Sequence, residues 1–291
     1  MLIAGPTASG KSAAALRLAD GAARAGRVAW IVNADAMQVY DALRVVTARP
    51  TEAEERRASH RLYGHVPASR RYSVGAWLAD AEAALKEAED AGALAIVTGG
   101  TGLYFRALTE GLAEVPAIPR ATRAEWAARL QTEGIASLHA LLATRDPDSA
   151  AAIRPSDTQR TLRALEVLDA TGRPLSAWQM MESAPPRIAA DVPRFVLEPE
   201  RAELHRRIEA RFDRMVAGGA LAEVEALLAQ GLDPDLPAMK AIGVRAFAAH
   251  LRGETSLEAA ISAAKAETRR YAKRQSTWFR NQMPDWPRVA A

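Results

Sequence analysis

The chain has 291 residues, 49% of them hydrophobic and 25% charged, and a formal net charge of +3. This balance is typical of a globular protein, and no apolar run approaches the roughly 20 residues of a membrane span. Cysteine is absent, which excludes disulfides, thiolate metal sites and cysteine nucleophiles. We expect a cytoplasmic protein without a targeting segment, with two domains or one domain and an insertion, and take a monomer as the default.

A phosphate-binding loop follows the first predicted strand, Met1–Ala4. The next residues, GPTASGKS, match G-x-x-x-x-G-K-[ST] and precede an Ala/Leu-rich helical stretch. Glycines let backbone N–H groups curl around an anion, while the helix N-terminus and the lysine add positive charge. The serine hydroxyl of such a loop contacts a Mg²⁺ that bridges the phosphates. The predicted loop consists of Gly5, Pro6, Thr7, Ala8, Ser9, Gly10, Lys11 and Ser12, with Ser12 as the metal ligand.

Short apolar runs and helical stretches alternate through the N-terminal part of the chain. Arg27–Asp35 and the first part of Gly92–Leu108 are predicted strands, and Ser73–Gly92 between them has helical spacing and ends on a glycine cap. This alternation indicates a parallel sheet, whose strand carboxyl ends meet at one edge. We expect the phosphate loop, Ala34–Gln38 and Gly99–Gly102 to converge there.

A helical region without strand character interrupts this pattern. It spans Arg120–Trp178, after a linker that contains Pro116 and Pro119. Strand character returns at Phe195–Glu200, and the remaining stretches are again helical. We therefore predict an α/β core of the P-loop NTPase type with a parallel sheet, residues 1–112 and 190–291, and an all-helical insertion domain, residues 113–189.

Two residues at predicted strand ends are candidates for chemistry. Asp35 is placed to act as a Mg²⁺ ligand or a general base, and equally to form an Asx turn. Thr101, in the glycine-rich turn GGTG, offers a hydroxyl to a ligand or simply belongs to a tight turn. No acid ends the strand LAIVTGG, where a typical nucleotide hydrolase binds its metal, and this disfavours a plain ATPase.

Two C-terminal stretches are rich in arginine and lysine. Arg207 and Arg211 are spaced to clamp phosphates, although pairing with surface acids such as Glu203 is favoured by the local sequence alone. Lys265–Gln282 combines basic rows with aromatic residues, which suits either a nucleic-acid backbone or a solvated helix. The five histidines show no pairing that predicts a metal site.

Eight motifs resemble, in order and spacing, those of the bacterial tRNA isopentenyltransferase family, the tRNA dimethylallyltransferases, across essentially the whole chain. They are GPTASGKS, ADAMQVYDALRVVTARP, HRLYGHVP, GGTGLYFRAL, DTQRTLRALEV, RIEARFDRM, KAIGVR and AKRQSTWFR. The resemblance implies transfer of a dimethylallyl group from dimethylallyl diphosphate to N6 of the adenosine 3′ of the anticodon in tRNA. The phosphate loop would then hold the diphosphate leaving group.

The resemblance also implies roles for individual residues. Asp35 would be the base and Thr101 would touch the nucleotide, while Lys11, Arg211 and a Mg²⁺ on Ser12 would stabilise the diphosphate. The target base must be flipped out of its stack, and the helical domain would grip the anticodon stem–loop. The implied tRNA contacts are Asp35, Ala36, Met37, Gln38, Thr101, Arg123, Gln159, Arg160, Thr161, Leu162, Arg163, Lys240, Ala241, Ile242, Gly243, Val244 and Arg245.

This chain departs from the family pattern at Ala36, where serine is usual, and at Val46, where glycine is usual. Three alternatives stay open. An adenylate isopentenyltransferase would act on free nucleotide without the insertion, and a P-loop nucleoside or nucleotide kinase would turn over ATP. A nucleic-acid-binding module with a vestigial loop is disfavoured, because Lys11, Ser12, Asp35 and Thr101 occur together.

Overall fold

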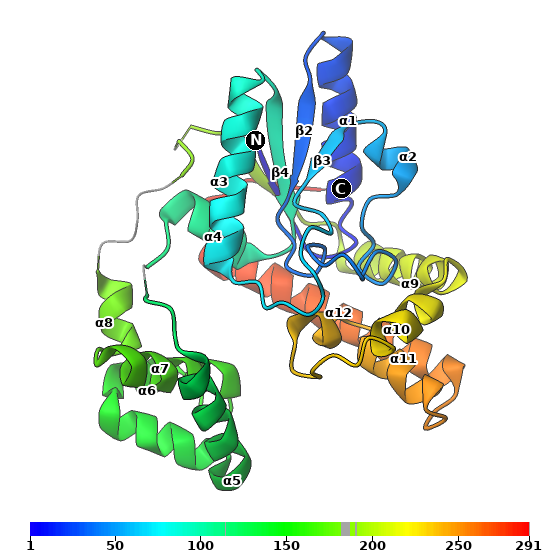
Figure 1. Ribbon diagram of the computed structural model, residues 1–291. Coiled ribbons are helices and arrows are strands. Elements are labelled where there is room, and N and C mark those ends of the chain that lie inside the picture. The colour runs from blue at the N-terminus through cyan, green and yellow to red at the C-terminus, as the bar shows by residue number, and fades with distance from the viewer. Residues whose placement is uncertain (114, 182–186, 190, 291) are drawn as a thin grey trace. The chain divides into compact units, whose positions relative to one another are not determined.

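The computed structural model describes residues 1–113, 115–181, 187–189 and 191–290 (Figure 1). The chain forms two compact units. The first consists of Met1–Thr109 and Ile188–Ala291, and the second of Glu110–Arg187. The sequence suggested 113 and 189 as the limits of the inserted part, so the second unit begins and ends slightly earlier than expected.

One parallel six-stranded sheet organises the first unit, with the order β3-β2-β4-β1-β5-β6. This confirms the predicted α/β class. The two edge strands were not predicted, because they are very short and contain polar residues where a buried strand would have an apolar run. The strands are β1 (Leu2–Ala4), β2 (Ala29–Asn33), β3 (Ser59–Arg61), β4 (Leu94–Gly99), β5 (Arg194–Leu197) and β6 (Arg288–Val289).

Helices pack on the sheet through small and aromatic residues. The sheet lies between α1 (Lys11–Arg24) and α3 (Val74–Asp90) (Figure 1). The buried face of α1 is largely alanine, which lets the helix approach the strands closely. Ser73 caps α3 by accepting a hydrogen bond from Ala76 N, and buried Trp77 donates to Asn33 O at 2.8 Å. Two shorter helices complete this part, α2 (Glu52–Glu55) and α4 (Gly102–Glu110).

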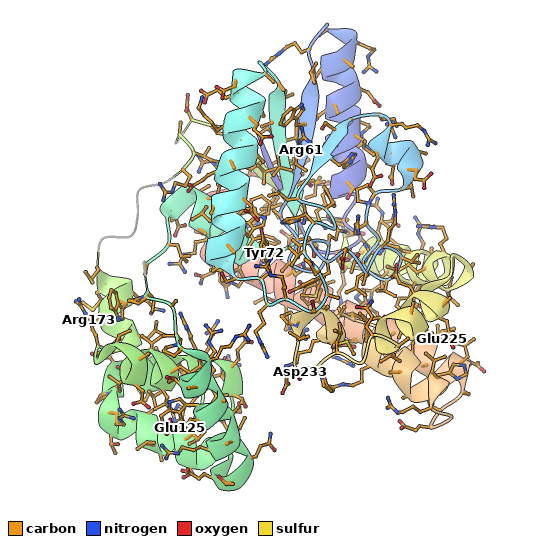
Figure 2. The ribbon with its side chains drawn as sticks, in the orientation of Figure 1. Arg61, Tyr72, Glu125, Arg173, Glu225 and Asp233 are labelled. Atoms are coloured by element: carbon orange, nitrogen blue, oxygen red, sulfur yellow. The ribbon has the colours of Figure 1, made fainter. Side chains whose placement is uncertain are left out.

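The C-terminal helices form a second apolar cluster at the carboxyl ends of the strands. The long helix α12 (Leu257–Gln282), orange to red in Figure 1, crosses beneath β2 and β4. Tyr72, labelled below α3 in Figure 2, packs on this cluster, and its hydroxyl donates to Asp80 Oδ2 at 2.6 Å. The other members are α9 (Arg201–Ala217), α10 (Ala220–Leu228), the short 3-10 helix Pro237–Lys240 and α11 (Val244–Leu251).

The described residues of the second unit form helices and loops, without a strand. It contains α5 (Arg120–Arg145), α6 (Pro147–Ala152), α7 (Thr158–Thr171) and α8 (Leu175–Met180). Its own apolar core is centred on Trp126, whose indole N–H donates to Asp169 Oδ2 at 2.9 Å. Near α8, the Arg173 guanidinium, labelled in Figure 2, lies over the Trp178 ring. Across the described part of the chain, no helix combines the length and apolarity that a membrane crossing requires.

The close contact between Gly99 and the backbone of Ala34 gives a first prediction. A Cβ at position 99 would lie 2.0 Å from Ala34 O, so one of the two backbones would have to shift. We expect Gly99→Ala to lower the free energy of unfolding by about 1–3 kcal/mol, as overpacking does. Gly21→Ala in α1 is the control, because its Cβ meets no atom closer than 3.9 Å and alanine favours helix by about 0.5–1 kcal/mol. Urea denaturation measures both, and equal stability of Gly99→Ala and wild type would contradict the prediction.

Candidate functional site

The phosphate loop, defined as Gly5–Ser12, connects β1 to α1 in a conformation suited to anions. Ala8 and Gly10 have positive φ, 62° and 92°, so the chain curls before the helix begins at Lys11. Lys11 folds back over the loop and donates to Pro6 O at 3.1 Å. Buried Ser9 Oγ has no hydrogen-bond partner among the described residues. The loop therefore offers an ammonium group and a helix N-terminus to a ligand.

The surroundings of Lys11 shift its pKa in opposite directions. Burial lowers its pKa to about 8, Asp35 raises it and Arg211 lowers it again. These three groups therefore lie close enough to influence one another. A phosphate bound beside Lys11 would favour the charged amine, because an anion opposes the effects of burial and of the neighbouring guanidinium.

Two arginines of α9 reach the phosphate loop. Arg211, whose pKa is lowered by burial, donates from Nη2 to Thr7 Oγ1 at 2.6 Å. Arg207 donates to Ser9 O at 3.2 Å and also pairs with Glu203 at 2.6 Å. The acid pairing suggested by the local sequence thus holds for Arg207, but the same side chain also supports the loop. Arg207 is thus a residue of the site that was not predicted from the sequence.

Asp35 forms the Asx turn considered for it, and its role toward a ligand stays a prediction. Its Oδ1 accepts from Met37 N at 2.9 Å, and its own N–H donates to Asn33 Oδ1 at 2.9 Å, so one carboxylate oxygen fixes the turn after β2. The structure assigns Oδ2 no hydrogen-bond partner within the described chain. One oxygen thus holds the backbone while the other is free for a ligand or a proton.

The turn after β4 packs against the turn that carries Asp35. Thr101 N donates to Ala34 O at 3.1 Å, and Thr101 Oγ1 accepts from Ala36 N at 2.9 Å. The close approach depends on Gly99, which leaves space for the Ala34 backbone. The expected convergence of the phosphate loop, Ala34–Gln38 and Gly99–Gly102 is therefore present.

A cavity of about 230 Å³ opens at this convergence. Its lining includes Asp35, Thr7 and Arg211, and also Tyr271 of α12. Burial, reinforced by the Asp35 charge, raises the pKa of Tyr271, so this phenol stays neutral. A small apolar space beside charged groups suits a ligand with a short hydrocarbon part and an ionic part. The apolar lining includes Met37, Val46, Ile208, Phe212, Met215 and Ile242.

Hydrogen bonds with residues outside the cavity hold the part of its wall that contains Val46 and Thr47. Glu223 of α10 accepts hydrogen bonds from the N–H groups of Arg44, Val45 and Val46, at 2.6–2.8 Å. Gln38 donates to Thr47 O and Ala48 O. The amide N–H₂ of Gln38, a predicted tRNA contact, is thus engaged within the protein.

The predicted tRNA contacts of the first unit include both exposed and buried residues. Lys240 and Arg245 are exposed, and Lys240, Ala241 and Ile242 line the cavity. Val244 is 2% exposed and Gly243 is buried as well. The prediction for the Val244 side chain is wrong, because it packs in the apolar cluster of α9–α12.

In the second unit, Arg123, Gln159 and Arg160 are exposed. Burial lowers the pKa of Arg163, and Arg123 lowers it further, so these two cations are neighbours. Thr161 is completely buried, and Leu162 packs on the core around Trp126. The prediction of tRNA contact is therefore wrong for the Thr161 side chain, which faces the interior of its helix bundle.

The basic face of α12 is partly neutralised within the first unit. Lys265 pairs with Asp213 and Glu209 of α9, and Arg269 also pairs with Glu209. Arg270 and Lys273 remain exposed on the same helix.

Comparison with known proteins agrees with this geometry. The family model described as IPP transferase matches residues 38–282. A tRNA dimethylallyltransferase from Azorhizobium caulinodans is 55% identical over 99% of this chain and 91% of its own length. The crystal structure of the full-length tRNA isopentenylpyrophosphate transferase from Bacillus halodurans is 32% identical, with a TM-score of 0.69 over 99% of this chain and 88% of that one. A eukaryotic dimethylallyltransferase acting on tRNA has a TM-score of 0.80 and 25% identity, over 99% of this chain and 73% of that one. The chain therefore belongs to the IPP transferase family.

Proposed function

We propose that this chain transfers a dimethylallyl group from dimethylallyl diphosphate to N6 of the adenosine 3′ of the anticodon in tRNA, releasing diphosphate. The observation that carries the proposal is one cavity lined by Asp35 together with Thr7 of the phosphate loop and Arg211, which contacts it. The donor's leaving group and the acceptor's proton would be received in the same small space. We further propose that the enzyme works as a monomer in the cytoplasm.

The phosphate loop would receive the diphosphate. Lys11 and Arg211 supply positive charge. Negative charge accumulates on the leaving group as the carbon–oxygen bond breaks, and fixed cations in a water-poor site stabilise that charge. The apolar cavity lining, including Val46 and Met215, would enclose the dimethylallyl group.

The residues at the loop also fit a Mg²⁺ that is carried mainly by its substrate. Within the described residues, no group of three or more His, Cys, Asp and Glu side chains could hold a metal. Ser12 is exposed at the start of α1 and offers one hydroxyl oxygen. Mg²⁺ commonly takes most of its ligands from water and phosphate oxygens, so this sparse donor set suits it. We propose Ser12 as its protein ligand; when bound, the ion neutralises charge on the diphosphate.

Asp35 would receive the proton of the acceptor amine. The N6 nitrogen attacks the C1 carbon of the dimethylallyl group, the carbon–oxygen bond breaks, and its electron pair leaves with the diphosphate. The nitrogen loses a proton to Asp35 Oδ2, the oxygen that does not hold the Met37 N–H. Thr101, attached to the same turn through Ala36 N, would border the nucleotide.

The tRNA contacts are proposed for the exposed cations of both units. In the first unit these are Lys240, beside the cavity, and Arg245. In the second they are Arg123, Arg160 and the partly buried Arg163. Cations at these positions would bind the phosphate backbone of the anticodon stem–loop, while the target base leaves its stack to reach the cavity. An enzyme that acts on free AMP would not need the helical unit. The presence of this unit, with its own core, therefore favours tRNA over free AMP as the acceptor.

The first experiment offers wild-type protein labelled dimethylallyl diphosphate and Mg²⁺, with an unmodified anticodon stem–loop or AMP as acceptor. We expect label in the stem–loop only. Label in AMP would assign the chain to the adenylate isopentenyltransferases. ATP consumption without label transfer, followed in a parallel reaction, would assign it to the kinases.

Replacing Asp35 tests the base. Asp35→Asn keeps an oxygen for the Met37 N–H but removes the carboxylate, so we expect kcat to fall about 10²- to 10⁴-fold with little change in stem–loop affinity. The control is Asp41→Asn in the same loop, because Asp41 Oδ1 also accepts backbone N–H groups but does not line the cavity. Unchanged kcat in Asp35→Asn would remove Asp35 as the base.

The lowered pKa of Lys11 predicts a pH dependence of donor binding. The protonated fraction of Lys11 falls as pH rises through about 8, so binding of dimethylallyl diphosphate should weaken at higher pH, by up to about tenfold per pH unit. Lys11→Arg stays charged over this range and should lose that part of the dependence, and the comparison cancels ionisation of the ligand itself. Calorimetric titration between about pH 7 and 9 measures both. Identical pH profiles for the two proteins would exclude Lys11 as the titrating group.

A further inference from the structure

A buried glutamine of α12 joins the phosphate loop to the turn after β4. Gln275 is 6% exposed, its Oε1 accepts from Thr7 N at 2.8 Å, and its Nε2 donates to Gly100 O at 2.8 Å. Both ends of the amide are therefore used. The orientation of the amide is determined by its partners, because the reverse orientation would face N–H with N–H and oxygen with oxygen.

The glycines of the turn GGTG make room for this helix. A Cβ on Gly100 would lie 2.3 Å from Gln275 Nε2, and a Cβ on Gly102 would lie 2.0 Å from the Trp278 ring. Two motifs far apart in the sequence, GGTG and KRQSTW, thus fit together as one contact surface. Gln275 has no chemical role in the proposed reaction. Its amide is nevertheless buried between the two loops and hydrogen-bonded to both of them.

The contacts of Gln275 continue to both substrate sides of the cavity. On the donor side, Thr7 is held at its N–H by Gln275 and at its hydroxyl by Arg211. On the acceptor side, Gly100 is followed by Thr101, which is hydrogen-bonded to Ala34 O and Ala36 N, the residues that flank Asp35. A continuous path of hydrogen bonds and chain therefore runs from the phosphate loop to Asp35.

We infer that Gln275 is a positioning residue that couples the phosphate loop to the Thr101 turn, so that filling of the loop by diphosphate orders the acceptor side of the cavity. Its catalytic consequence rests on the proposed function. Group transfer needs the reacting atoms about 3–3.5 Å apart in good alignment, and a misplacement of about 1 Å costs roughly 10²-fold in rate. A side chain that fixes the distance between the two loops acts on that alignment without touching the reacting atoms.

The coupling is tested by hydrogen exchange with inorganic diphosphate and Mg²⁺ as the probe. In wild type, the probe should slow amide exchange in Gly5–Ser12 and also in Gly99–Gly102. In Gln275→Met, which keeps the side-chain length but has no amide, protection should be confined to Gly5–Ser12. The matched control is Gln282→Met on the same helix, because Gln282 is exposed and its Oε1 accepts only a hydrogen bond from Arg106 among its described contacts.

Kinetics gives a second, independent measurement. We expect Gln275→Met to lower kcat about 10- to 100-fold while the KM for the stem–loop changes less than about threefold. Gln275→Glu can donate to Gly100 O only when protonated, so its kcat relative to wild type should rise as pH falls. Thermal unfolding of each variant identifies losses that come from the fold alone.

Protection of both segments in Gln275→Met would overturn the inference, and so would protection of Gly5–Ser12 alone in wild type. A wild-type protein that transfers no label would contradict the proposed function, whereas the exchange experiment would still decide on Gln275. The two failures are therefore distinguishable.

Discussion

The partial burial of Lys11 and Arg211, with Asp35 beside them, is the constraint on which the site depends. Burial lowers the pKa of both cations, while Asp35 raises each of them. Removing charged groups from water is costly unless neighbours compensate. The single carboxylate offsets part of this cost, and an arriving polyanion would offset more. The arrangement therefore favours an occupied phosphate loop.

The sheet brings these groups together. Parallel strands β2, β4 and β1 are neighbours, so the turn with Asp35, the turn with Thr101 and the phosphate loop begin at one edge. The C-terminal helices then supply what the strands lack, namely Arg207 and Arg211 from α9 and Gln275 from α12. A catalytic centre at this edge thus needs residues from both ends of the chain.

The local sequence was sufficient to predict the features that depend only on residues near one another in the chain. The phosphate loop, the class of the fold and the positions of Asp35 and Thr101 follow from glycine spacing and apolar runs. Gln275 and Glu223 carried no such signal. The partners of Gln275 are 268 and 175 residues away along the chain, and those of Glu223 are 177–179 residues away. The error at Thr161 has a simple cause. A motif assigned as a whole segment does not distinguish the helix face shared with Ala164 and Leu165 from the face turned to solvent.

The contacts of Glu223 have a consequence for the folding of the chain during its synthesis. The loop Ala34–Pro50 has hardly any regular structure and is held by a carboxylate from α10, while β1 pairs with β5 only after the whole helical unit has been synthesised. Pairings between such distant segments form late and slowly. A nascent chain that ends before α10 therefore contains the phosphate loop and Asp35, but not the support that holds the cavity wall. The binding site matures only when synthesis is nearly complete.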